Sequence, residues 1–144
     1  MIVGIPAETF SGERRVALAP ESVQRLVAKK IQVWLQSGAG AAGAWFSDDD
    51  YRRAGATIEA SVDALLSSSD LIVKIHAPSP SEAELMKPAA TLICLLYPRL
   101  NLEATRRLAE RRITAVALEN LPRSTVRKRW TSSVRRARRR VTAR

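Results

Sequence analysis

Cationic and aromatic side chains stand at the ends of three apolar segments in this sequence. They are Arg14, Arg15, Lys74, His76, Tyr97 and Arg99. If the three segments are parallel strands of one sheet, their carboxyl ends meet at a single edge, which is where ligands bind in such sheets. Cations gathered there would suit a carboxylate, because ammonium and guanidinium groups form charge-assisted hydrogen bonds with it.

The elements that must position these residues alternate along the chain. We expect strands at 1–6, 31–36, 55–60, 70–78, 90–98 and 113–120, and helices at 20–30, 47–51, 61–69, 79–88 and 101–112. Pro20 is suited to open the first helix, and Ser47 and Asn101 are suited to cap two others. The expected strands are continuous apolar runs, which favours an α/β fold with a parallel sheet and helices on both faces.

Bulk properties exclude several classes of protein. The chain has 144 residues, 46% of them hydrophobic, so it suits one domain with a real core. It holds no apolar run long enough to span a membrane, and we expect no signal peptide. The single cysteine, Cys94, lies in an apolar run and is expected in the core, in a reducing cytosolic setting.

The glycines Gly38, Gly40 and Gly43 spell the pattern G-x-G-x-x-G after an expected strand. A dinucleotide-binding fingerprint needs a helix directly after that pattern, so that the helix N-terminus can face a pyrophosphate. Here the next helix begins only near Ser47. We therefore interpret the segment as a tight strand-to-helix connection and not as a cofactor site.

Charge divides the chain in two. Residues 1–122 hold all 14 acidic residues and 14 of the 24 Lys and Arg, so their net charge is zero, and residues 123–144 hold the other 10 cations. We find no apolar periodicity in this tail and expect it to be disordered or weakly helical. One hypothesis is a basic arm that binds nucleic acid non-specifically through phosphates. Trp130 is its only aromatic residue, so stacking on bases is not indicated.

Several short motifs occur in one order along the first 125 residues. They read GIPAET, ERRVALAPESV, QSGAG, YRRAGA, DLIVKIHAP and ALENLPR. This series resembles the N-terminal domain shared by alanine dehydrogenases and the alpha subunit of proton-translocating NAD(P) transhydrogenase. The resemblance implies a Rossmann-like or flavodoxin-like domain over residues 1–121. It also implies a second domain that binds NAD(H), which we expect to be absent from these 144 residues.

The resemblance also assigns roles at the expected sheet edge. Alanine dehydrogenases hold the substrate carboxylate with an arginine and a lysine that match Arg15 and Lys74; the alternative is that both residues make structural ion pairs. The catalytic histidine of alanine dehydrogenases matches Tyr97, and a phenol is a poor base at neutral pH. His76 does not match that histidine. We therefore favour the transhydrogenase, with an alanine dehydrogenase fragment as the alternative, and assign no catalytic residue and no metal ligand.

The tail has a second interpretation. Codons permitted for residues 125–136, read from the last base of the Thr125 codon, encode R-A-Q-A-M-D-V-L-S-S-Q, which resembles the nicotinamide loop of transhydrogenases. One lost base would make residues 122–144 an out-of-frame product. Arg123 matches the arginine of that loop and would keep its cofactor-binding position, whereas the loop's glutamine, aspartate and serine fall at Lys128, Thr131 and Val134.

The intact enzyme that the resemblance implies passes a hydride from NAD(H) on this subunit to NADP(H) on a partner. Its partners are a beta subunit and a second alpha subunit, and it lies in the cytoplasm against the inner membrane. We expect the chain by itself to bind neither cofactor and to be inactive.

Overall fold

The computed structural model describes residues 1–41 and 45–121. Three predictions therefore lie outside the described residues: the disorder of the basic tail, its reading frame and the position of Arg123.

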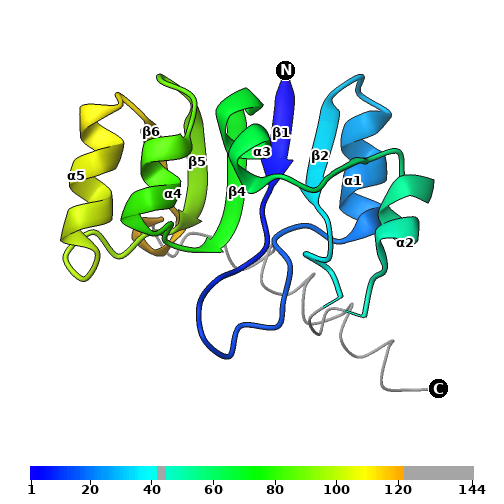
Figure 1. Cartoon of the computed structure of the whole chain (residues 1–144), viewed down its shortest axis with the longest axis horizontal. Coiled ribbons are helices and arrows are strands. Elements are labelled where there is room, and N and C mark those ends of the chain that lie inside the picture. The colour runs from blue at the N-terminus through cyan, green and yellow to red at the C-terminus, as the bar shows by residue number, and fades with distance from the viewer. Residues whose placement is uncertain (42–44, 122–144) are drawn as a thin grey trace.

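Six parallel strands form one sheet in the order β3-β2-β1-β4-β5-β6 (Figure 1). They are β1 (Ile2–Ile5), β2 (Gln32–Gln36), β3 (Thr57–Glu59), β4 (Leu71–His76), β5 (Thr91–Leu95) and β6 (Thr114–Ala117). The predicted parallel sheet and all six predicted strands are confirmed. The order reverses between β1 and β4, because β1 leads to β2 on one side and β4 leads to β5 on the other.

Five helices connect the strands: α1 (Pro20–Val27), α2 (Asp48–Arg53), α3 (Val62–Ser68), α4 (Pro80–Leu85) and α5 (Leu102–Glu110). Local signals fix where they begin. Pro20 and Pro80 occupy the first turns of α1 and α4, where a missing N–H costs nothing. Ser47 with Asp50, and Ser79 with Glu82, form capping boxes at α2 and α4.

The helices divide between the two faces of the sheet, as predicted. One buried cluster joins α1 and α2 to β1 and β2 through Val23, Tyr51, Val3 and Leu35. The other cluster joins α3, α4 and α5 to β4 and β5, and its members include Leu65, Met86, Leu108, Leu92 and Cys94. Figure 1 shows α5 and α4 at the end of the sheet formed by β6 and β5, α3 between β4 and β1, and α1 and α2 at the other end. Cys94 is buried in this core, as expected.

Two local predictions need correction. Asn101 is the N-cap residue of α5, as predicted, but its side chain makes no capping bond; its amide donates instead to the carbonyl oxygens of Leu96 (2.8 Å) and Tyr97 (3.4 Å), which ties the turn after β5 together. The last predicted strand also ends early. Residues Leu118–Asn120 form a 3₁₀ helix, η1, because the Glu119 carboxylate turns back to accept hydrogen bonds from the end of β5.

No helix in the described ranges is long and apolar enough to cross a membrane.

Candidate functional site at the carboxyl edge of the sheet

The loop after β1 meets the end of β4 where the strand order reverses. In parallel sheets this switch point opens a crevice at the carboxyl edge, and ligands bind there. Glu8 fastens the loop to β4: its carboxylate accepts hydrogen bonds from the backbone N–H of Ile75 (2.6 Å) and His76 (3.2 Å). The loop and the strand end are thereby held as one unit.

Glu13 organises the outer portion of the same loop. Its carboxylate accepts from the guanidinium of Arg15 (Nε at 2.8 Å and Nη2 at 2.5 Å) and lies 2.9 Å from Nε2 of His76. The Phe10 ring stacks on His76 with ring centroids 4.3 Å apart. The hydrogen bond from Arg15 holds the pKa of Glu13 well below its usual range, and the same bond raises the pKa of Arg15. The cluster is therefore a charged Glu13 shared by two basic side chains.

Lys74 is buried, with only 1% of its side chain exposed. Its Nζ lies 2.6 Å from Oε1 of Glu82, and the other carboxylate oxygen of Glu82 accepts from the backbone N–H of Ser79 (2.7 Å). Glu82 therefore caps α4 and neutralises Lys74 at once. A buried ammonium requires such a partner, because desolvation of an unpaired charge is very costly.

Arg15 and Lys74 thus each carry a partner within the protein, Glu13 and Glu82. Of the two alternatives raised by the sequence, this geometry matches structural ion pairs. A ligand carboxylate would have to compete with both glutamates. The role of the two cations toward a ligand stays a prediction.

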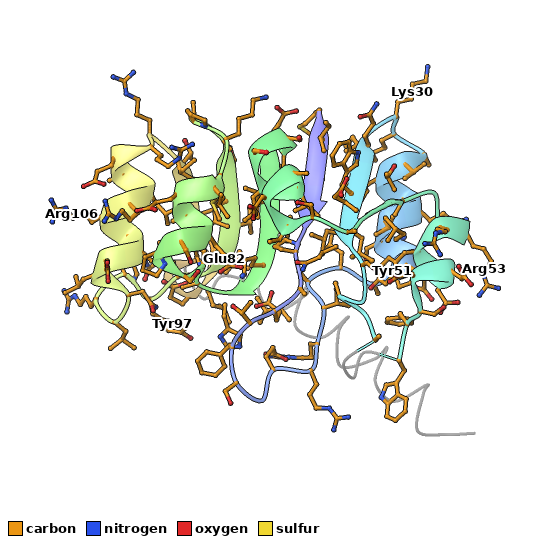
Figure 2. The ribbon with its side chains drawn as sticks, in the orientation of Figure 1. Lys30, Tyr51, Arg53, Glu82, Tyr97 and Arg106 are labelled. Atoms are coloured by element: carbon orange, nitrogen blue, oxygen red, sulfur yellow. The ribbon has the colours of Figure 1, made fainter. Side chains whose placement is uncertain are left out.

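Tyr97 stands at the end of β5 and is 46% exposed. Its φ of 43° lies in the left-handed region, which is strained for a residue with a side chain. Glu119 holds this conformation by accepting hydrogen bonds from the N–H of Tyr97 (2.8 Å) and Leu96 (3.0 Å). Tyr97 and Arg99 line a hollow of about 400 Å³ with η1, and Figure 2 shows Tyr97 at the same end of the sheet as Glu82.

Comparison with known proteins identifies the family to which this domain belongs. The model of the alanine dehydrogenase/PNT N-terminal domain matches residues 4–132. The chain belongs to this family.

The relatives of this alanine dehydrogenase/PNT domain include both transhydrogenases and alanine dehydrogenases. NAD(P) transhydrogenase subunit alpha from Cereibacter sphaeroides is 37% identical over 85% of the chain and 23% of the relative. A transhydrogenase structure from Sinorhizobium meliloti has a TM-score of 0.80 at 33% identity, over 87% of this chain and 37% of that one. An L-alanine dehydrogenase structure has a TM-score of 0.76 at 35% identity, over 81% and 32%. The chain therefore spans about a quarter to a third of the length of its relatives.

Members of this family are named for nicotinamide-dependent enzymes, so we tested whether the glycine segment after β2 fits a dinucleotide. The Gly38 N–H (2.9 Å) and the Ser37 hydroxyl (2.7 Å) both donate to the Asp48 carboxylate in the first turn of α2. Asp49 and Asp50 follow in the same turn. These two donors are therefore occupied, and the three carboxylates of this turn would repel a pyrophosphate. The described residues of the segment do not fit a dinucleotide.

The cations of this domain's edge were predicted from the sequence, but its acids were not: Glu8, Glu13, Glu82 and Glu119. One of the four carried a readable signal, because Ser79 and Glu82 have the spacing of a capping box. The other three bond to groups that are distant in sequence or lie in an irregular loop, which no local pattern reports. Among the described residues, no group of three or more metal-ligating side chains comes together.

Proposed function

We propose that this chain is the N-terminal domain of a transhydrogenase-type alpha subunit, and that it frames the hydride-transfer cleft without performing the chemistry. The observation that carries the proposal is Tyr97. It stands exposed at the end of β5, where the resemblance places the acid/base histidine of alanine dehydrogenases. A direct hydride transfer between two nicotinamides moves no proton at this position and needs no base there.

The edge geometry supports this choice over an alanine dehydrogenase. That enzyme needs free cations for the carboxylate of its substrate, whereas Arg15 and Lys74 are held by Glu13 and Glu82. Sequence identity does not separate the branches, since the matches to transhydrogenases and alanine dehydrogenases overlap at 32–38%. The side chains at the edge therefore support the transhydrogenase branch.

In the intact enzyme we place NAD(H) on a second domain of the alpha subunit and NADP(H) on a partner beta subunit, at the cytoplasmic side of the inner membrane. The role of the present domain is to present a rigid, water-excluding wall at the carboxyl ends of β4 and β5. The Glu8 and Glu119 carboxylates serve that role by fixing these strand ends. By itself the chain should bind neither nucleotide.

We also propose that the basic tail arose by the loss of one base near Thr125. Resequencing the gene across the codons for residues 122–136 tests this. An additional base that restores R-A-Q-A-M-D supports the proposal, and an unchanged frame from an independent template refutes it.

A chimera tests the functional proposal. Residues 1–121 would replace the matching segment of the Cereibacter sphaeroides transhydrogenase subunit alpha and, in parallel, that of an alanine dehydrogenase. We expect hydride transfer from NADH to an NADP analogue, with the partner subunits added, only in the first chimera. Tyr97→His should raise pyruvate amination in the second chimera and leave transhydrogenation unchanged. Amination at the parental rate without Tyr97→His would refute the proposal.

The purified 144-residue chain tests the expectation that the domain alone is inactive. It should show no transhydrogenation with the partner subunits and no saturable binding of NADH by calorimetry. Turnover of the same order as the intact enzyme would overturn the expectation of inactivity.

A further inference from the structure

Strand β6 forms one edge of the sheet, at the opposite end from α1 and α2 (Figure 1). Its only partner strand among the described residues is β5. Thr114, Ala115 and Val116 are all exposed. Ala115 is exposed although it pairs with the buried Leu92, on the face of the sheet that carries α3, α4 and α5. The outer side of β6 is therefore accessible to another strand.

The ladder between β5 and β6 shows which backbone groups of β6 point outward. The N–H of Thr114 donates to the carbonyl oxygen of Ala90 (3.0 Å), so Thr114 is turned toward β5. Successive residues of a strand direct their N–H and C=O groups to alternate sides. Val116 therefore also bonds toward β5, whereas Ala115 and Ala117 direct their N–H and C=O groups away from the sheet. These two residues offer donors and acceptors that the ladder does not use.

β6 lacks most of the features that protect an edge strand. Natural edges carry charged residues, proline or a bulge, which prevent pairing with another chain. β6 reads Thr-Ala-Val-Ala, and its register with β5 is unbroken. Only its length of four residues limits what can pair with it. The other edge strand, β3, has three residues and includes the charged Glu59. The β6 edge is thus an interaction surface that an added strand fits.

We propose that β6 pairs with β6 of a second copy of this chain, about a twofold axis near Val116. The two strands run antiparallel, because a twofold axis perpendicular to the sheet reverses the strand direction. Ala115 of each copy then lies opposite Ala117 of the other, and each such pair exchanges two N–H···O=C bonds. The two six-stranded sheets join into one.

The side chains and charges around β6 favour a copy of the same strand as the partner. No side chain of β6 is larger than valine, so the strands can approach to about 4.8 Å without a clash. The exposed Arg112 precedes β6, and Glu119 follows it. Antiparallel pairing brings the beginning of one strand beside the end of the other, so Arg112 of each copy lies near Glu119 of its partner. Such charge complementarity fixes the orientation of an interface.

This proposal concerns the 144-residue chain and does not rest on the proposed function. Because the paired segment is short, we expect a weak dimer, with a Kd of about 1–100 µM. Residues 123–144 add 10 cations to each copy, which repel one another. The measurement therefore belongs at an ionic strength of about 0.15 M, where charges more than about 8 Å apart are largely screened.

Sedimentation of the full chain and of matched variants tests the proposal. Ala115→Pro removes an outward N–H and leaves the ladder to β5 intact, so the domain should fold, since edge strands accept proline at such positions. It should raise the Kd of the dimer at least about tenfold. Val116→Lys brings two ammonium groups together near the axis and should also raise the Kd. Thr57→Lys adds the same charge to the exposed start of β3 and should leave the Kd close to that of the unsubstituted chain.

Hydrogen exchange identifies the surface that forms the dimer. Dilution through the Kd should accelerate exchange at the N–H groups of Ala115 and Ala117, while those of Thr114 and Val116 stay protected by β5. A chain that is monomeric up to about 1 mM would overturn the proposal. So would a dimer in which Ala115 and Ala117 exchange freely, because another surface would then form it. Protection of both amides in a monomer would overturn it as well, because another part of the same chain would then cover the edge.

Discussion

Glu8 and Glu119 perform the same task on neighbouring strands. Each carboxylate accepts hydrogen bonds from two consecutive backbone N–H groups, Glu8 at the end of β4 and Glu119 at the end of β5. These N–H groups lie where the ladder of the parallel sheet stops, and a partly buried N–H without an acceptor is costly. The two glutamates thereby fix the edge on which the proposed function depends.

Glu119→Ala should weaken this edge. It removes the acceptor of two N–H groups and releases the strained backbone of Tyr97, so we expect a loss of about 1.5–3 kcal/mol in the free energy of unfolding. Glu103→Ala, in the exposed first turn of α5, is the control and should cost about 0.5 kcal/mol. Urea unfolding gives the energies, and hydrogen exchange should show faster exchange at Leu96 and Tyr97. Unchanged exchange at both amides would contradict the assignment.

Lys74→Met should be severe, because it leaves Glu82 buried without its cation. We expect a loss of about 3–5 kcal/mol in the free energy of unfolding. Lys87→Met is the matched control: Lys87 pairs with Asp70 at 2.7 Å, but both side chains are about half-exposed, so the cost should be below about 1 kcal/mol. Equal urea midpoints for the two variants would show that burial of the Lys74–Glu82 pair does not determine the loss of stability.

The stability of the loop after β1 should depend on acid pH through Glu13. The folded-state pKa of Glu13 is lowered by its bond to Arg15, so the stabilisation is complete above the unfolded-state pKa of about 4.3 and is lost as pH falls toward the lower folded value. Glu13→Gln should therefore be less stable than the unsubstituted chain by about 1–2 kcal/mol at pH 7. The difference should shrink progressively below pH 4, as measured by urea unfolding. A difference that stays constant down to pH 2 would exclude this linkage.

Gly4 in β1 lies under α3 and leaves no room for a side chain. A Cβ there would lie 2.2 Å from the hydroxyl oxygen of Ser69 and 3.0 Å from Leu65. Gly4→Ala should cost about 1–3 kcal/mol. Because the closest clash is with the Ser69 hydroxyl, the same change should cost less in a Ser69→Ala background, and a double-mutant cycle by thermal unfolding measures that coupling. If the free-energy losses of Gly4→Ala and Ser69→Ala simply add, the clash with the Ser69 hydroxyl is not the cause of the destabilisation.

Local sequence was sufficient for the fold because its signals act over short distances. Continuous apolar runs such as LIV at 71–73 and LICLL at 92–96 predicted buried parallel strands, and Ser47 predicted where α2 begins. Asn101 shows the limit of this reasoning. Its Nδ2 donates to the carbonyl oxygen of Leu96 across the turn after β5, and its side chain makes no capping bond to α5.

By itself, the sequence determined the α/β class, the number of strands and the cations that gather at one sheet edge, because hydrophobic period and helix capping are local properties. Only the tertiary structure decided that Arg15 and Lys74 are each neutralised within the domain. The partners, Glu13 and Glu82, become partners through the bend of one loop and the packing of α4 on β4. Only the tertiary structure, again, left one face of β4 and β5 without a helix from the described residues, because coverage is a property of how layers stack. The free energy of a buried charge or of an apolar face depends on what lies against it, and that is set by contacts between residues that are distant in the chain.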